Sequence, residues 1–209
     1  LDWVKDQKMR KEYLKKASRN VERMIRLVQD MDVLARLESN QLVLQKEAYS
    51  LTEQIEDALE QMSDRIAQQG LTVVRDFDPE SDCAVFADPE RMDQVVLNLI
   101  SNAIKYSRDE PGGFVRVAIE DSGDKAYNVI IEDNGLGISK EDLGRVFERF
   151  YRGDRSRTRT KKIGGTGLGL AIVKHIVEAH GHAIKVTSTQ GVGTAFSFTI
   201  SKAQPLAVS

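Results

Sequence analysis

Two asparagines and a lysine recur at helical spacing in the middle of the sequence, at Asn98, Asn102 and Lys105. At 3.6 residues per turn these three side chains share one face of a helix. Amide oxygens suit magnesium, which usually keeps several waters and bridges substrate phosphates, and an ammonium adds charge for those phosphates. The spacing therefore favours a magnesium and phosphate site, with an ordinary solvated polar face as the alternative.

A second group, Asp133-Asn134-Gly135-Leu136-Gly137, follows an expected strand. A carboxylate fixed at a strand end can accept a hydrogen bond from a purine amino group, and the glycines leave room for the ring. A turn capped by its own aspartate is the other interpretation.

Glycine is concentrated, because eight of the 15 glycines lie between residues 135 and 169. The run from Gly164 to Leu170 leads into a helix, whose free N–H groups and positive end could hold phosphates. It matches neither a Walker loop nor a dinucleotide fingerprint, so a plain glycine-rich turn stays open. The segment 152–162 before it has six basic residues, one acid and no apolar residue, which predicts a mobile lid. Nucleic-acid binding is disfavoured, since aromatics are absent there and the net charge is −2.

The elements that position these groups follow from periodicity and capping. Apolar residues recur at heptad spacing from about Arg10 to Glu38, which predicts either a helix packed on its own domain or half of a helical hairpin that dimerises. A capping box at Ser50 and Glu53 opens a second helix that Gly70 closes. Asp88 and Pro89 open a helix to Tyr106, with a core face of five residues. These five are Met92, Val96, Leu99, Ile100 and Ala103. A last helix is expected over 168–179, and strands over 71–77, 83–87, 114–120, 127–132, 184–188 and 195–200.

Helices and strands alternate irregularly, which predicts an α+β fold: a two-layer α/β sandwich in which helices cover one face of a mixed sheet. An N-terminal helical arm precedes it. With 41% hydrophobic and 30% charged residues, the composition excludes general disorder. The lone Cys83 excludes an intrachain disulfide and a cysteine zinc site. We find neither a membrane span nor a signal peptide, and the start without Met suggests a piece of a longer protein.

In this order, the four clusters resemble the catalytic, ATP-binding domain of sensor histidine kinases, in the wider group of gyrase, heat-shock chaperone and mismatch-repair ATPases. The family's N box matches residues 98–106, its first glycine box 133–137, its F box 147–152, and its second glycine box Gly165, Gly167 and Gly169. The resemblance covers about residues 44–201.

By this resemblance Asn98 and Asn102 coordinate Mg²⁺, Lys105 and Arg149 serve the phosphates, and Asp133 reads adenine. The catalytic residues would be Asn98, Lys105 and Arg149. The remaining nucleotide contacts that it implies are Tyr106, Gly135, Gly137, Phe150, Arg152, Gly165, Thr166, Gly167, Leu168 and Gly169.

The resemblance also divides the chain into the second helix of the dimerisation and phosphotransfer hairpin (1–43), the catalytic domain (44–203) and a tail (204–209). The phosphoacceptor histidine belongs on the preceding helix, which is absent, and we expect structural or surface roles for His175, His180 and His182. The implied partners are that histidine-bearing helix, a response regulator and a second copy of the chain. The implied location is a cytoplasmic fragment of a membrane-anchored receptor.

The ATPase relatives carry a glutamate where Asn98 stands, and that glutamate polarises the attacking water. An amide is not a base, so we predict magnesium-dependent ATP binding with negligible hydrolysis. The leading hypothesis is an ATP-dependent histidine kinase core. The alternatives are a serine kinase of the anti-sigma type and a nucleotide-sensing scaffold without transfer activity.

Overall fold

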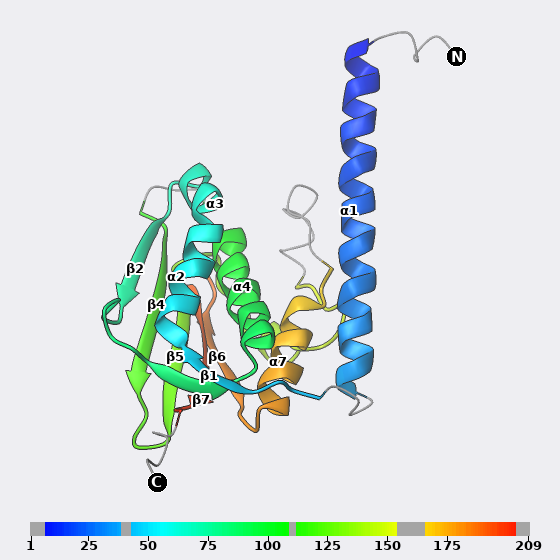
Figure 1. Cartoon of the computed structure of the whole chain (residues 1–209). Helices are drawn as coiled ribbons and strands as arrows, with labels where there is room; N and C mark the ends of the chain where they lie inside the picture. The colour runs from blue at the N-terminus through cyan, green and yellow to red at the C-terminus, as the bar shows by residue number, and fades with distance from the viewer. Residues whose placement is uncertain (1–6, 39–42, 109–111, 154–165, 204–209) are drawn as a thin grey trace.

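A five-stranded mixed sheet forms one layer of the molecule (Figure 1). The computed structural model describes residues 7–38, 43–108, 112–153 and 166–203. The sheet order is β2-β4-β5-β7-β6; β2 and β4 are parallel, and the other neighbours are antiparallel. The strands are β2 (Thr72–Asp76), β4 (Phe114–Asp121), β5 (Ala126–Asp133), β6 (Ile184–Thr189) and β7 (Gly193–Ser201).

Three helices cover one face of this sheet, α2 (Leu51–Gln61), α4 (Pro89–Tyr106) and α7 (Gly169–Ala179) (Figure 1). The core lies between the two layers, where Leu99 of α4 and Ile131 of β5 are both buried. The predicted two-layer α+β fold is therefore confirmed.

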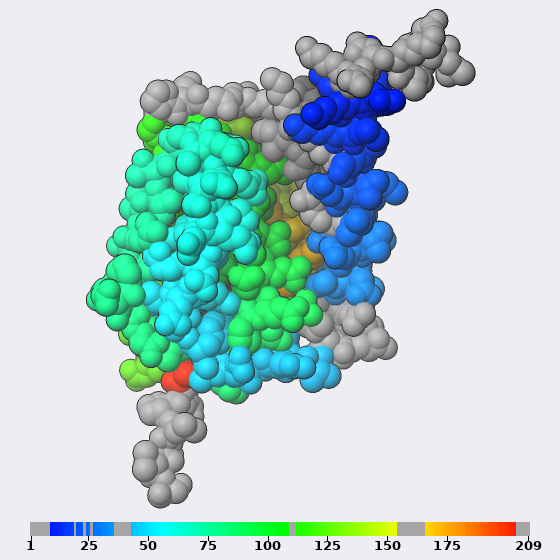
Figure 2. All heavy atoms as spheres, turned by 45° about the horizontal axis from the view of Figure 1, so that its top comes forward, coloured from blue at the N-terminus to red at the C-terminus, as the bar shows by residue number. Residues whose placement is uncertain are grey.

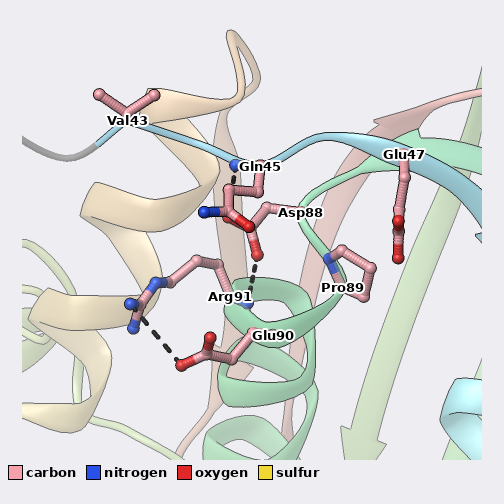
Figure 3. A pocket seen from close by; sticks show the side chains of 7 residues that line it. All are labelled: Val43, Gln45, Glu47, Asp88, Pro89, Glu90 and Arg91. Atoms are coloured by element: carbon pink, nitrogen blue, oxygen red, sulfur yellow. Dashed lines mark hydrogen bonds and ion pairs between the residues drawn. The ribbon is translucent and has the colours of Figure 1, made fainter.

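Helix α4 begins and ends where its sequence predicts. The Asp88 carboxylate accepts the backbone N–H of Arg91 at 3.1 Å and that of Gln45 at 2.9 Å, so it caps the helix and ties the preceding segment to it (Figure 3). Pro89 is the first helical residue. All five residues of the predicted core face are at most 4% exposed. Burial of this face turns the side carrying Asn98 away from the core.

The expected second helix is two helices, α2 and the short α3 (Ser63–Gln68), which meet at Met62. Ser50 caps α2 as predicted, because its hydroxyl accepts the Glu53 backbone N–H at 3.4 Å. Strand β3 (Ala84–Ala87) was expected, but it joins a separate antiparallel pair with β1 (Glu47–Ser50), which the sequence did not predict.

The 32-residue helix α1 (Gln7–Glu38) lies beside the globular part and packs against α7 (Figures 1 and 2). Leu34 is 4% exposed at this contact, whereas Met24 and Val28 are each 66% exposed. A row of apolar side chains on α1 is thus left without cover. Among the helices of the described ranges, none has the length and apolar character needed to cross a membrane.

His180 is a structural residue, as expected. Its ring is buried at the end of α7, where Nε2 accepts the Asp88 backbone N–H at 3.1 Å and Nδ1 lies 2.8 Å from the Ile176 carbonyl. An accepting Nε2 requires the proton on Nδ1. The ring therefore links α7 to the start of α4, and its burial lowers its pKa. His182 lies between the hydroxyls of Thr199 and Ser201.

Candidate functional site

The loop after β5 meets the end of α4 at a contact that only glycine allows. A Cβ on Gly135 would lie 2.2 Å from the carbonyl oxygen of Tyr106. The same oxygen accepts the backbone N–H of Leu136 at 3.0 Å. The first glycine cluster and the amide-bearing helix therefore form adjoining walls of one site. At Gly137, φ is +63°, and a Cβ would lie 2.1 Å from the carbonyl of Thr189.

Asp133 is fixed and mostly removed from water at the base of this loop. Its side chain is 6% exposed, and Oδ1 accepts the Gly135 backbone N–H at 2.8 Å. Burial raises the pKa of Asp133 to about 6, against the effect of backbone hydrogen bonds from Gly135 and Thr194, and nearby Glu132 adds to the rise. Near neutral pH the carboxylate is ionised and directed by the backbone, which suits it to accept a hydrogen bond.

Asn98 faces the second glycine cluster. Its Nδ2 donates to the Gln94 carbonyl at 2.9 Å, which fixes the amide and leaves Oδ1 directed at the start of α7. A Cβ on Gly169 would lie 2.7 Å from that oxygen. Asn102 and Lys105 are half-buried on α4, and the Lys105 ammonium lies 4.7 Å from the centroid of the Tyr106 ring. The predicted polar face is therefore present beside α7.

The segment from Phe147 also reaches this cluster. Phe150 donates its backbone N–H to the Gly167 carbonyl at 2.9 Å, and a Cβ on Gly167 would lie 2.9 Å from the Phe150 Cα. Phe150 has a φ of +59° and Gly167 a φ of +76°. Positive φ strains the backbone of Phe150 but not that of glycine, which has no Cβ. The Phe150 side chain is 56% exposed. An aromatic ring is thus available at the surface next to the glycine loop.

Arg149 and Arg152 lie on the same segment. Arg149 is exposed. Burial is the main cause of the lowered pKa of His175 on α7, and the charge of Arg149 lowers that pKa further. The Nε atom of Arg152 is buried and has no acceptor among the described residues. A buried donor of this kind needs an acceptor, which an oxyanion would supply. The predicted contact Gly165 and the basic lid segment 154–162 lie outside the described residues.

Thr166 connects this region to α1. Its hydroxyl accepts the Leu168 backbone N–H at 3.2 Å and donates to Asp30 Oδ2 at 3.0 Å. Leu168 itself is fully buried at the start of α7. Sequence reasoning missed Asp30, because 136 residues separate the two partners and an aspartate on a polar helix face gives no local signal.

Arg108 is the other residue that sequence reasoning missed. Its guanidinium donates to the carbonyls of Gly135, Gly191 and Val192, with N···O distances of 3.4 Å to the first and the last. It therefore bridges the loop after β5 and the turn between β6 and β7. Carbonyl acceptors occur on every residue, so no sequence pattern points to this role.

The described residues fit a magnesium ion only with help from a ligand. They contain no group of three or more His, Cys, Asp or Glu side chains that could hold a metal. The amide oxygens of Asn98 and Asn102 are hard neutral donors, which magnesium accepts when phosphates and waters complete its shell. The donor set therefore fits a metal that arrives with a phosphate compound.

A separate depression of about 330 Å³ lies at the opposite end of α4 (Figure 3). Asp88 and Arg91 border it, together with Val43 of the segment before β1. At 1.5 Å per residue, ten residues of helix place it roughly 15 Å from Asn98. It does not belong to the site formed by the glycine clusters.

Comparison with known proteins agrees with this geometry. Residues 87–204 match the family described as "Histidine kinase-, DNA gyrase B-, and HSP90-like ATPase". The sensor histidine kinase WalK of Bacillus subtilis (strain 168) is 37% identical over 189 residues, which is 90% of this chain and 30% of that protein. The chain thus spans less than a third of this relative's length.

Two solved structures are similar over most of their length. The histidine kinase AdeS of Acinetobacter baumannii has a TM-score of 0.73 and 30% identity, covering 95% of this chain and 86% of that one. The mycobacterial sensor histidine kinase MprB has a TM-score of 0.63 and 32% identity, covering 76% of this chain and 100% of that one.

Proposed function

This chain belongs to the family of histidine kinase-, DNA gyrase B- and HSP90-like ATPases, and we propose that it binds ATP with magnesium and donates the γ-phosphate to a histidine on another helix. The observation that carries the proposal is the convergence of four clusters, joined by close contacts at Gly135, Gly167 and Gly169. The similarity to sensor histidine kinases supports the phosphate acceptor.

Asp133 is the residue that recognises adenine in this proposal. Its carboxylate is held by two backbone N–H groups and retains an acceptor position for the amino group of the base. Gly135 and Gly137 let the loop lie against the carbonyls of Tyr106 and Thr189, which a side chain would prevent. Tyr106 and the exposed ring of Phe150 flank the nucleotide. A base without an amino donor at this position should bind more weakly.

The phosphates lie between α4 and the start of α7. The amide oxygens of Asn98 and Asn102 would hold the magnesium, which when bound neutralises charge on the phosphates. Lys105 and Arg149 supply positive charge to the same oxygens. Among the described residues the Nε of Arg152 has no acceptor, and an anionic ligand would supply one. The positive end of α7 also favours an anion, although the Thr166 hydroxyl already accepts the Leu168 N–H there.

Transfer to histidine rather than to water follows from the amide at Asn98. Its nitrogen is bonded to the Gln94 carbonyl, and neither end of an amide accepts a proton from water near neutral pH. Phosphoryl transfer depends on positioning and charge neutralisation, so an incoming imidazole can react while water stays inactive. The domain should therefore hold ATP with little turnover until its acceptor helix docks.

The N-terminal residues 1–43 are proposed to be the second helix of a dimerisation and phosphotransfer hairpin. The uncovered apolar side chains of α1, including Met24 and Val28, support pairing with further helices. In the whole protein, the first helix would carry the acceptor histidine and a response regulator would receive the phosphate. A membrane-anchored receptor is the proposed parent.

Calorimetry of ATP binding with and without magnesium tests the nucleotide site. A chain that takes up no ATP with magnesium present would refute the proposal, and rapid hydrolysis without an acceptor would contradict the role of Asn98. Labelled ATP with a supplied histidine-bearing hairpin tests the acceptor. Label on histidine supports this function; label on a partner serine would indicate a serine kinase, and no transfer a nucleotide-sensing scaffold.

A further inference from the structure

Arg108 lies two residues after the end of α4, and its guanidinium donates hydrogen bonds to two separate backbone segments. One is the loop after β5, through the Gly135 carbonyl; the other is the turn between β6 and β7, through the carbonyls of Gly191 and Val192. A planar guanidinium presents five donors in a rigid fork, so arginine can hold several acceptors at once.

These two segments are the ones that hold the carboxylate of Asp133. Gly135, whose carbonyl Arg108 binds, donates its own N–H to Asp133 Oδ1 at 2.8 Å. Thr194, which follows the turn, donates the other backbone N–H to the same carboxylate. The segments also touch each other, because a Cβ on Gly193 would lie 2.0 Å from the Asp133 carbonyl oxygen.

We propose that Arg108 is a positioning residue for nucleotide recognition, which fixes both backbone N–H donors of Asp133 by holding the carbonyls beside them. The proposal rests on the proposed function, since it assumes that Asp133 reads adenine. Arg108 acts through the loop and the turn and does not itself touch the nucleotide. Its loss should therefore affect binding of ATP rather than the transfer step.

The test compares Arg108→Ala with the wild type by calorimetry of Mg-ATP binding and by the kinetics of transfer to a supplied histidine hairpin. We expect Kd and KM to rise about tenfold and kcat to stay within about twofold, as for the loss of one or two hydrogen bonds that orient a binding group. Arg108→Lys should recover part of the affinity, because an ammonium on a flexible stem cannot span both segments as the fork does.

Arg75→Ala is the matched control. Arg75 makes two hydrogen bonds to Glu56, at 2.7 and 2.9 Å, on the edge strand β2. An equal loss of affinity in the control would indicate general destabilisation and overturn the proposal. Three other results would also overturn the proposal: an unchanged Kd for ATP in a folded Arg108→Ala, a fall in its kcat at constant KM, or wild-type affinity in Arg108→Lys. Should Arg108→Ala fail to fold, the partial loss in Arg108→Lys decides. Wild-type protein that binds no ATP would refute the proposed function itself.

Discussion

The carboxyl group of Asp133 predicts how nucleotide affinity depends on pH. Burial raises its pKa to about 6, and Glu132 adds to the rise, although backbone hydrogen bonds from Gly135 and Thr194 lower it. Only the ionised form keeps acceptor oxygens free for an amino donor. ATP affinity should therefore be constant above about pH 7 and fall as the pH drops through 6, with about a tenfold loss at pH 5.

The same pKa shift has the opposite consequence for the nucleotide-free fold. The folded-state pKa lies above the unfolded value of 3.8, so the uncharged form of Asp133 favours folding. This stability is fully present below the unfolded pKa and is lost as the pH rises through about 6. The rise in the pKa of Asp133 from 3.8 to about 6 corresponds to about 3 kcal/mol of unfolding free energy. The charge that is proposed to recognise adenine thus destabilises the empty domain.

Asp133→Asn separates the two effects in one set of measurements. Calorimetry from pH 8 to pH 5 should show weaker ATP binding by the variant at high pH, without the wild-type loss below pH 6. Titration of the nucleotide phosphates is common to both proteins and cancels in the comparison. Thermal unfolding without nucleotide should show the variant gaining stability relative to the wild type as the pH rises. Parallel affinity profiles for the two proteins would refute the reasoning.

Three further predictions use the same assays. Gly135→Ala should raise the Kd for ATP at least about tenfold, because the new Cβ would lie 2.2 Å from the Tyr106 carbonyl oxygen. Gly144→Ala is the control and should bind ATP normally, because its Cβ would have nothing within 4 Å. His180→Ala should lose about 2 kcal/mol of stability in thermal unfolding. Burial lowers the pKa of His180, so the folded protein favours the neutral ring. The contribution of His180 to wild-type stability should therefore be lost as the pH falls below about 6.5, the pKa of histidine in the unfolded chain. The same loss in His180→Ala would show that another group causes it. Arg149→Ala should slow transfer to histidine more than it weakens binding, and equal effects would argue against a role in transfer.

The sequence predicted those parts of the fold that local chemistry determines. Helix α4 was predicted with its correct ends because Asp88 and Pro89 supply a cap and a fixed φ, and because apolar residues mark one face. Asp133 was predicted as a site residue because a carboxylate at a strand end can accept a hydrogen bond from a purine amino group, although a turn capped by its own aspartate gives the same pattern. The family resemblance decided between the two, and the role of Asp133 stays a prediction. Its raised pKa could not be predicted, since that depends on burial by distant strands.

The missed features depend on contacts between distant segments. Strand β1 has four residues, two of them exposed, and is held by pairing with β3, which a local pattern does not reveal. The hydrogen bond from Thr166 to Asp30 joins two polar residues that are common at surfaces. Arg108 binds only carbonyls. A side-chain pattern cannot identify residues whose partners are backbone atoms.

The glycine contacts explain why four weak motifs together indicate one site. Each motif alone has an ordinary interpretation, as a polar helix face, a turn or a loop. A Cβ on Gly135, Gly167 or Gly169 would lie within 3 Å of Tyr106, Phe150 or Asn98, respectively. The glycines are therefore required by residues of other motifs, because a side chain there would separate the walls of the site. Independent turns would not need glycine at positions set by residues of another motif. The four motifs together therefore indicate one site more strongly than each motif does alone.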